Sequence, residues 1–76
     1  MIKKYNATIE YDTKNNHPDD KNINNLKYND IYTVDTNYFN DNQHIINYIK
    51  NDMRLVAGGG YETNTIKNVK FIILAN

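Results

Sequence analysis

The sequence predicts a small α+β domain in which an antiparallel or mixed sheet of three to four strands packs against one main helix, at about residues 41–57. Three observations predict it: an alternating strand pattern near the start of the chain, one helical apolar stripe in its second half, and an apolar strand near its end. The expected order is strand, short helix or loop, strand, helix, and then one or two strands. Because 76 residues bury only about 60% of their unfolded surface, we expect residues 1–76 to form a single domain.

The first strand is predicted at residues 5–11. Apolar side chains there (Tyr5, Ala7, Ile9, Tyr11) alternate with Asn6, Thr8 and Glu10. Residues 13–25 contain the single proline and almost no apolar anchors, which predicts a long polar loop. A short helix over residues 19–29, capped by Asp19 or Asp20 and carrying Ile23 and Leu26, is the alternative for part of this segment.

The second strand is predicted at residues 30–36, which are β-branched and aromatic and place Tyr32 and Val34 on one face. The main helix follows from about Asp41. Asn40 and Gln43 have the spacing of a capping box at its start. Its apolar stripe consists of Ile45, Ile46, Ile49, Met53 and Val56. Three glycines, residues 58–60, should end the helix, because glycine adopts the left-handed conformation without steric cost.

The last strand is predicted to be apolar on both faces. Residues 61–65 are expected to form a short edge strand, and residues 67–74 follow with Val69, Phe71 and Ile73 on one face and Ile72 and Leu74 on the other. Such a strand is normally central and covered on both sides. One helix covers only one face, so the second must be covered by residues 19–29, by tyrosines of other strands, or by another molecule.

Charge and cysteine content exclude several classes of function. Nine basic residues balance nine acidic ones, which makes nucleic acid the less expected partner because phosphate binding needs a basic face. Without cysteine there is no disulfide, no thiolate zinc site and no thiol nucleophile. The longest apolar run, residues 71–75, is far shorter than the roughly 20 residues of a membrane span. We therefore expect a cytoplasmic protein with no membrane partner.

No set of residues predicts an enzyme. His17, Asp19 and Asp20 lie in the polar loop without the fixed geometry that a metal site requires. His44 near Asp41 is better explained as the start of a helix than as an acid/base pair, and the chain contains no serine. The three glycines follow a helix, whereas a phosphate loop precedes one. We expect no catalytic residue, no metal and no cofactor.

The remaining feature is tyrosine, which occurs seven times and is enriched at protein interfaces. Fifteen asparagines, ten isoleucines and eight lysines indicate an A/T-rich genome, and the short chain fits a phage or mobile element of a low-GC host. In general character the chain resembles small anti-restriction and anti-CRISPR proteins. We therefore expect it to bind and sterically inhibit a host protein, with Tyr28, Tyr32, Tyr38 and Tyr61 as anchors.

Two alternatives stay open. One is a regulator that binds nucleic acid on a sheet surface through tyrosines and through Lys67 and Lys70. The other is a homodimeric structural or assembly component in which two apolar strand faces meet.

Overall fold

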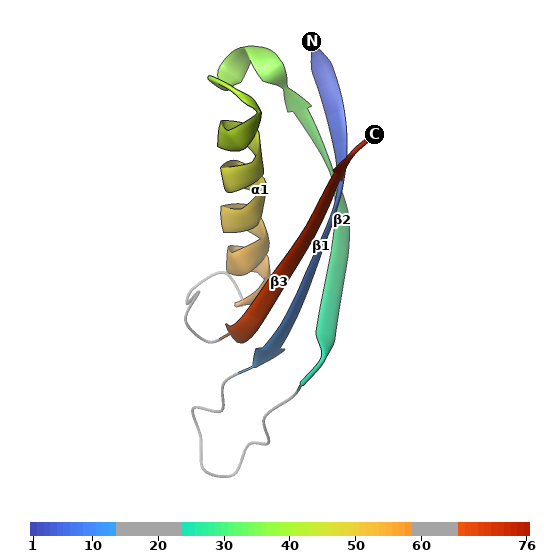
Figure 1. Ribbon diagram of the computed structural model, residues 1–76, viewed down its shortest axis with the longest axis vertical. Helices are drawn as coiled ribbons and strands as arrows, with labels where there is room; N and C mark the ends of the chain where they lie inside the picture. The colour runs from blue at the N-terminus through green and yellow to red at the C-terminus, as the bar shows by residue number, and fades with distance from the viewer. Residues whose placement is uncertain (14–23, 59–65) are drawn as a thin grey trace.

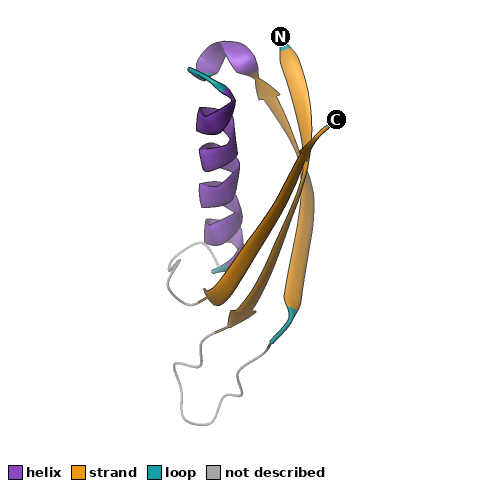
Figure 2. Cartoon of the chain, viewed as in Figure 1, coloured by secondary structure: helices purple, strands orange, loops and turns teal. Residues whose placement is uncertain are grey.

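The computed structural model describes residues 1–13, 24–58 and 66–76 and shows an α+β fold, as the sequence predicts (Figure 1). Its elements are β1 (Ile2–Thr13), β2 (Leu26–Asp35), the 3-10 helix η1 (Thr36–Tyr38), α1 (Asn42–Ala57) and β3 (Ile66–Ala75). The strands form an antiparallel sheet in the order β2-β1-β3, and α1 lies along one face of it (Figure 2). The strand expected at residues 61–65 lies outside the described residues.

The central strand of the sheet is β1, whose apolar and polar residues alternate, and not β3, which is apolar on both faces. Our interpretation of the two-faced strand as central is therefore wrong. An antiparallel sheet tolerates one uncovered face, so a strand with two apolar faces does not require a central place. In β3 the side chains of Val69, Phe71 and Ile73 pack toward the core, while Ile72 and Leu74 are exposed, as their alternation predicts.

The core lies between α1 and the sheet. Ile45, Ile49 and Met53 of the helix are buried against β1. The buried residues of the strands are Tyr5, Ala7, Ile9, Val34 and Ile66. Val56, which its spacing predicts to be part of the stripe, is instead about half exposed, and Ala57 packs against the core in its place. The stripe therefore continues from Met53 by a step of four residues rather than three.

The N-cap of the helix lies one residue later than the predicted Asn40. Asp41 is the N-cap, and its Oδ1 accepts a hydrogen bond from the His44 backbone N–H at 2.8 Å. His44 Nδ1 in turn accepts from the Asn40 backbone N–H at 3.1 Å. Gln43 donates to Asn47 and does not close a capping box. The carboxylate is the better acceptor for the first-turn amides, because the positive end of the helix dipole favours a negative charge.

The helix ends at Ala57, the predicted position. Gly58 is its C-cap, with φ −82°, and its N–H donates to the Arg54 carbonyl at 2.9 Å. Gly58 is thus not left-handed, and the next glycine lies outside the described residues.

The short helix that the sequence offered as an alternative near residues 19–29 does not include Leu26. This residue starts β2 and pairs with Tyr11 of β1. Asn25, directly before it, has φ 59°, a left-handed conformation that asparagine tolerates and that directs the chain into the strand. Residues 19–23 lie outside the described residues.

Two tyrosine hydroxyls join the helix to the sheet. Tyr5 of β1 donates to Asn42 Oδ1 at 2.6 Å, at the start of α1. Tyr32 of β2 donates to Asp52 Oδ2 at 2.6 Å, in its second half. Burial and then the hydrogen bond to Asp52 raise the pKa of Tyr32 well above its usual value of 10.0. The polar tips of these tyrosines are therefore satisfied inside the helix–sheet interface.

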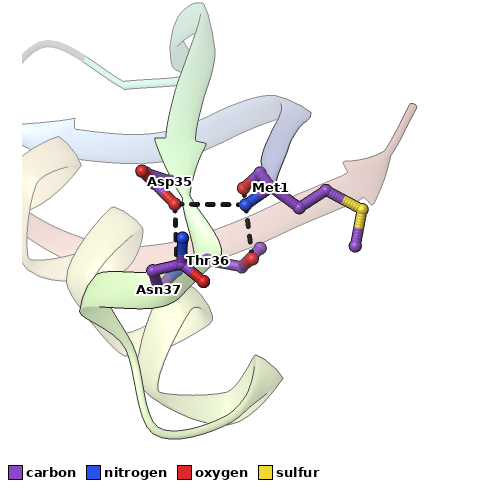
Figure 3. Close-up of polar contacts among 4 residues, drawn as sticks. All are labelled: Met1, Asp35, Thr36 and Asn37. Carbon is purple, nitrogen blue, oxygen red and sulfur yellow. Dashed lines mark hydrogen bonds and ion pairs between the residues drawn. The ribbon is translucent and has the colours of Figure 1, made fainter.

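A cluster of hydrogen bonds holds the end of β2 against the start of β1 (Figure 3). Asp35 Oδ1 accepts from the Asn37 N–H at 3.0 Å and lies 3.4 Å from the Met1 amine. The Met1 carbonyl accepts from the Thr36 backbone N–H at 2.8 Å and from its hydroxyl at 3.1 Å. Chiefly because of the Asn37 bond, the pKa of Asp35 lies below its usual 3.8. The cluster sets the point at which the chain leaves the sheet for η1.

Candidate interaction surface

The sheet has one face against α1 and one face turned away from it, which we call the outer face (Figure 1). Directly paired residues of antiparallel strands point to the same side, so the register assigns the outer face. Lys4, Asn6, Thr8 and Glu10 of β1 alternate with the buried Tyr5, Ala7 and Ile9 and lie on it. Their partners are Lys27, Asn29, Ile31 and Thr33 of β2 and Lys70, Ile72 and Leu74 of β3.

Four large aliphatic side chains are exposed on the outer face. The exposed fractions are 62% for Ile2, 57% for Ile31, 40% for Ile72 and 60% for Leu74. Ile31 and Leu74 both pair with Asn6, so they flank it from the two edge strands in one row. Single exposed aliphatic residues are ordinary, but several on one rigid sheet face mark a candidate contact surface.

The polar centre of the outer face is already hydrogen bonded within itself. The Asn29 amide donates to Asn6 Oδ1 at 2.7 Å and to Thr8 Oγ1 at 2.8 Å. Beyond this centre, Glu10 and Lys27 form an ion pair at 3.3 Å. Polar groups with partners lose less free energy on dehydration than unpaired ones. This face is therefore suited to being covered.

At one end of the sheet, Asp12 of β1 links the starts of the two neighbouring strands by hydrogen bonds. Its Oδ1 accepts from the Asn25 backbone N–H at 2.8 Å and its Oδ2 from Asn68 Nδ2 at 2.8 Å. Both asparagines have left-handed backbones, with φ 59° and 54°. These residues line an open cavity of about 390 Å³, together with Glu10, Tyr11, Leu26, Lys27 and Lys70. The hydrogen bonds to Asn68 and then Asn25 lower the pKa of Asp12 below 3.8.

Replacing Asp12 with asparagine should destabilise the fold at neutral pH and much less in acid. The folded pKa lies below the unfolded value of 3.8, so the stabilisation is complete above pH 3.8 and is lost as pH falls through the folded pKa. Urea denaturation of both proteins at neutral pH and below pH 3.8 measures this difference. An equal difference at the two pH values would show that the Asp12 charge is not its source.

The four tyrosines proposed as anchors do not form one patch. Tyr28 and Tyr32 lie on the helix-facing side of β2, pack against the core, and donate to Asp30 and Asp52. Burial, followed by the nearby Asp30, raises the pKa of Tyr28 above 10.0. Tyr38 lies on η1 and is 81% exposed, while Tyr61 lies outside the described residues. Of the described three, Tyr38 is therefore the one available as an exposed anchor.

His44, the described histidine that was considered as an acid or base, makes contacts that stabilise the start of the helix. His44 takes part in the helix N-cap, and its ring meets that of Phe39 edge to face, with centroids 5.1 Å apart. His17, Asp19 and Asp20 lie outside the described residues. Over the described ranges, no three histidine or acidic side chains are grouped so that they could hold a metal ion.

The outer face was only partly visible in the sequence. The alternation of β3 placed Ile72 and Leu74 opposite Phe71, but nothing local connected them with Ile31. That connection passes through Asn6, because pairing with β1 brings both edge strands into one row. The alternation of β2 could have identified Ile31, because Tyr32 and Val34 lie on one face of the strand and Ile31 therefore lies on the other.

Comparisons with protein-family models, curated protein sequences and solved structures gave no match to this chain. Within the described part of the chain, α1 is neither long nor apolar enough to cross a membrane.

Proposed function

We propose that this protein acts by binding another protein through the outer face of its sheet, and that it acts by contact rather than by catalysis. One observation carries the proposal: Ile31, Ile72 and Leu74 are exposed on a rigid sheet, on both sides of a polar centre that is already hydrogen bonded. Such a surface offers apolar contact area with few polar groups left to satisfy, which is the composition of the centre of a protein interface.

The composition of the chain indicates where its partner is to be sought. A neutral composition rich in asparagine, isoleucine and lysine fits a phage or mobile element of a low-GC host. We propose that the partner is a host protein in the cytoplasm and that binding inhibits it sterically, because a standard interface of about 800 Å² on each side is wide enough to block a functional site. Composition supports this step, and the exposed sheet face supports the mode of binding.

The geometry favours a protein partner over a nucleic acid. The outer face presents Lys4, Lys27, Lys67 and Lys70. Of these, Lys27 forms an ion pair with Glu10, and Lys67 lies opposite Asp12 in the ladder. Tyr28 and Tyr32 pack on the helix-facing side of β2, where they are not presented on the open face. A sheet that binds single strands needs aromatic rings on its open face, and the described part of this outer face has none.

Replacing Leu74 with glutamate should abolish or strongly weaken partner binding. A charged side chain at the centre of an apolar contact should cost about 2 kcal/mol or more, as the loss of a hot-spot residue does. The immobilised protein is first used to capture a stoichiometric partner from the lysate of a low-GC bacterium, and the affinity of the purified partner is then measured for each variant.

The matched control is Leu55→Glu, which makes the same change at an exposed leucine of α1, on the opposite side of the molecule from the outer face. This variant should bind as the unmodified protein does. Equal binding by Leu74→Glu and the unmodified protein would show that the outer face is not the docking surface. Failure to capture any stoichiometric partner would count against the function itself.

A further inference from the structure

Both outer strands of the sheet leave one edge without a ladder partner among the described residues. β2 and β3 each pair with β1 and with no other described strand. Proteins usually protect such edges with lysines, prolines or bulges. The first half of β3 has Lys67, Lys70 and a register shift at Asn68, but residues 71–75 have none of these devices. This half of β3 is therefore open to a further strand.

The two edges of the sheet carry opposite charges on the helix side. At the β3 edge, the Lys50 Nζ and Arg54 Cζ atoms lie 5.5 and 5.3 Å from the centre of the Phe71 ring. No carboxylate of the described residues forms an ion pair with either cation. At the β2 edge, the carboxylates of Asp30 and Asp52 accept from Tyr28 and Tyr32. The neutral chain thus has a basic edge and an acidic edge.

Residues of the two edge strands that pair with the same residue of β1 lie at the same level of the sheet, in what we call a row. Asn6 pairs with Ile31 on one side and Leu74 on the other, so these two side chains occupy one row of the outer face. On the helix side, Ile9 pairs with both Tyr28 and Phe71, and Ala7 pairs with both Asp30 and Ile73. A second copy placed beside the first would therefore bring Ile31 to Leu74, and Asp30 close to Lys50 and Arg54.

We propose that copies of this chain associate head to tail, with the β2 edge of one copy added to the β3 edge of the next. β2 and β3 are both antiparallel to β1 and hence parallel to each other, so a copy shifted sideways continues the sheet and keeps α1 on the same face. Charge complementarity decides against the symmetric pairings. Joining β3 to β3 brings Lys50 and Arg54 of one copy toward Lys50 and Arg54 of the other, so like charges repel. Joining β2 to β2 likewise brings the carboxylates of Asp30 and Asp52 in the two copies together.

Because the two joined edges differ, this contact is heterologous. It generates an open-ended series of copies rather than a closed dimer. In one row, Lys70 lies opposite Lys27 of the next copy, and these like charges repel. The repulsion is reduced because Lys27 already forms an ion pair with Glu10 of its own chain at 3.3 Å. The outer face stays uncovered, and Leu74 of one copy meets Ile31 of the next on it. The inference thus goes beyond the proposed function: it adds a self-association surface and widens the apolar strip that a partner would cover.

A charge exchange tests this arrangement in the full chain. Asp30→Lys places a cation beside Asp52, so that the β2 edge no longer complements the basic β3 edge. The double variant Lys50→Glu, Arg54→Glu makes both edges acidic. Sedimentation velocity from low micromolar to near-millimolar concentration, at low salt, should show the unmodified protein growing beyond a dimer. Each variant alone should associate at least about tenfold more weakly. An equimolar mixture should recover, because the junctions between the two different variants bring opposite charges together.

Lys4→Glu is the matched control, because this exposed charge belongs to the central strand and should leave association unchanged. Circular dichroism of each variant checks that it is folded. Three results would overturn the proposal: a monomer at all concentrations, a closed dimer that the charge changes do not affect, or no recovery in the mixture of folded variants. Partner capture by the Lys50→Glu, Arg54→Glu variant separates the two proposals, since its outer face is intact.

Discussion

Replacing Ile49 with alanine should lower the free energy of unfolding by about 2–5 kcal/mol, the usual cost of truncating a buried isoleucine. Ile49 is completely buried in the middle of α1 and faces the buried part of β1. A chain of this size has a small core, so such a loss is a large fraction of a total stability of about 5–15 kcal/mol. Urea denaturation followed by circular dichroism measures the change.

The control for this substitution is Leu55→Ala in the same helix. Leu55 is 43% exposed, so its truncation should change stability much less, within about 0.5–1 kcal/mol. Equal losses in the two variants would mean that α1 does not pack on the sheet through the face of Ile45, Ile49 and Met53.

Replacing Tyr32 with phenylalanine should destabilise the fold by about 1–3 kcal/mol, the range for losing a hydrogen bond to a charged group. The Tyr32 hydroxyl donates to Asp52 at 2.6 Å, and the variant leaves that carboxylate without its donor between helix and sheet. Tyr48→Phe, on the more exposed side of α1, is the matched control and should be nearly neutral. Thermal and urea denaturation of the three proteins measure the difference.

Alkaline pH provides an independent check on Tyr32. The unfolded chain loses the tyrosine proton near pH 10.0, and burial followed by the Asp52 bond raises the folded pKa above that value. The stabilisation is therefore complete below pH 10.0 and is lost as pH rises toward the folded pKa. The stability gap between the unmodified protein and Tyr32→Phe should narrow above pH 10.0. A constant gap would assign the loss to packing instead of to the hydrogen bond.

The positions of the elements follow from local patterns. The alternation around Ile9, the β-branched and aromatic run of β2, the apolar stripe of α1 and the apolar residues of β3 predict three strands and one helix. The ends of α1 and β3 lie within one residue of the predicted ones, whereas β1 and β2 begin three and four residues earlier than predicted. Errors occur where two acceptors compete locally, as at the helix start. There the Asp41 carboxylate caps the first turn, although Asn40 and Gln43 have the spacing of a capping box.

The roles of the tyrosines depend on distant residues. Tyr5 and Tyr32 have the same side chain as Tyr38, but their hydroxyls bond to α1, whereas Tyr38 is exposed on η1. No pattern within a few residues distinguishes these cases. For this reason the sequence proposed Tyr28 and Tyr32 as anchors alongside Tyr38 and did not single out Ile31.

By itself, the sequence determined the α+β class, the place of the helix and the two apolar faces of β3, because each depends on a periodicity within one segment. The tertiary structure decided that β1 is central, that β3 lies at an edge, and that Ile31 and Leu74 share a row across Asn6. These properties arise from pairing between segments far apart in the chain. The free energy of that pairing is shared among both strands and the helix, so no single segment encodes it.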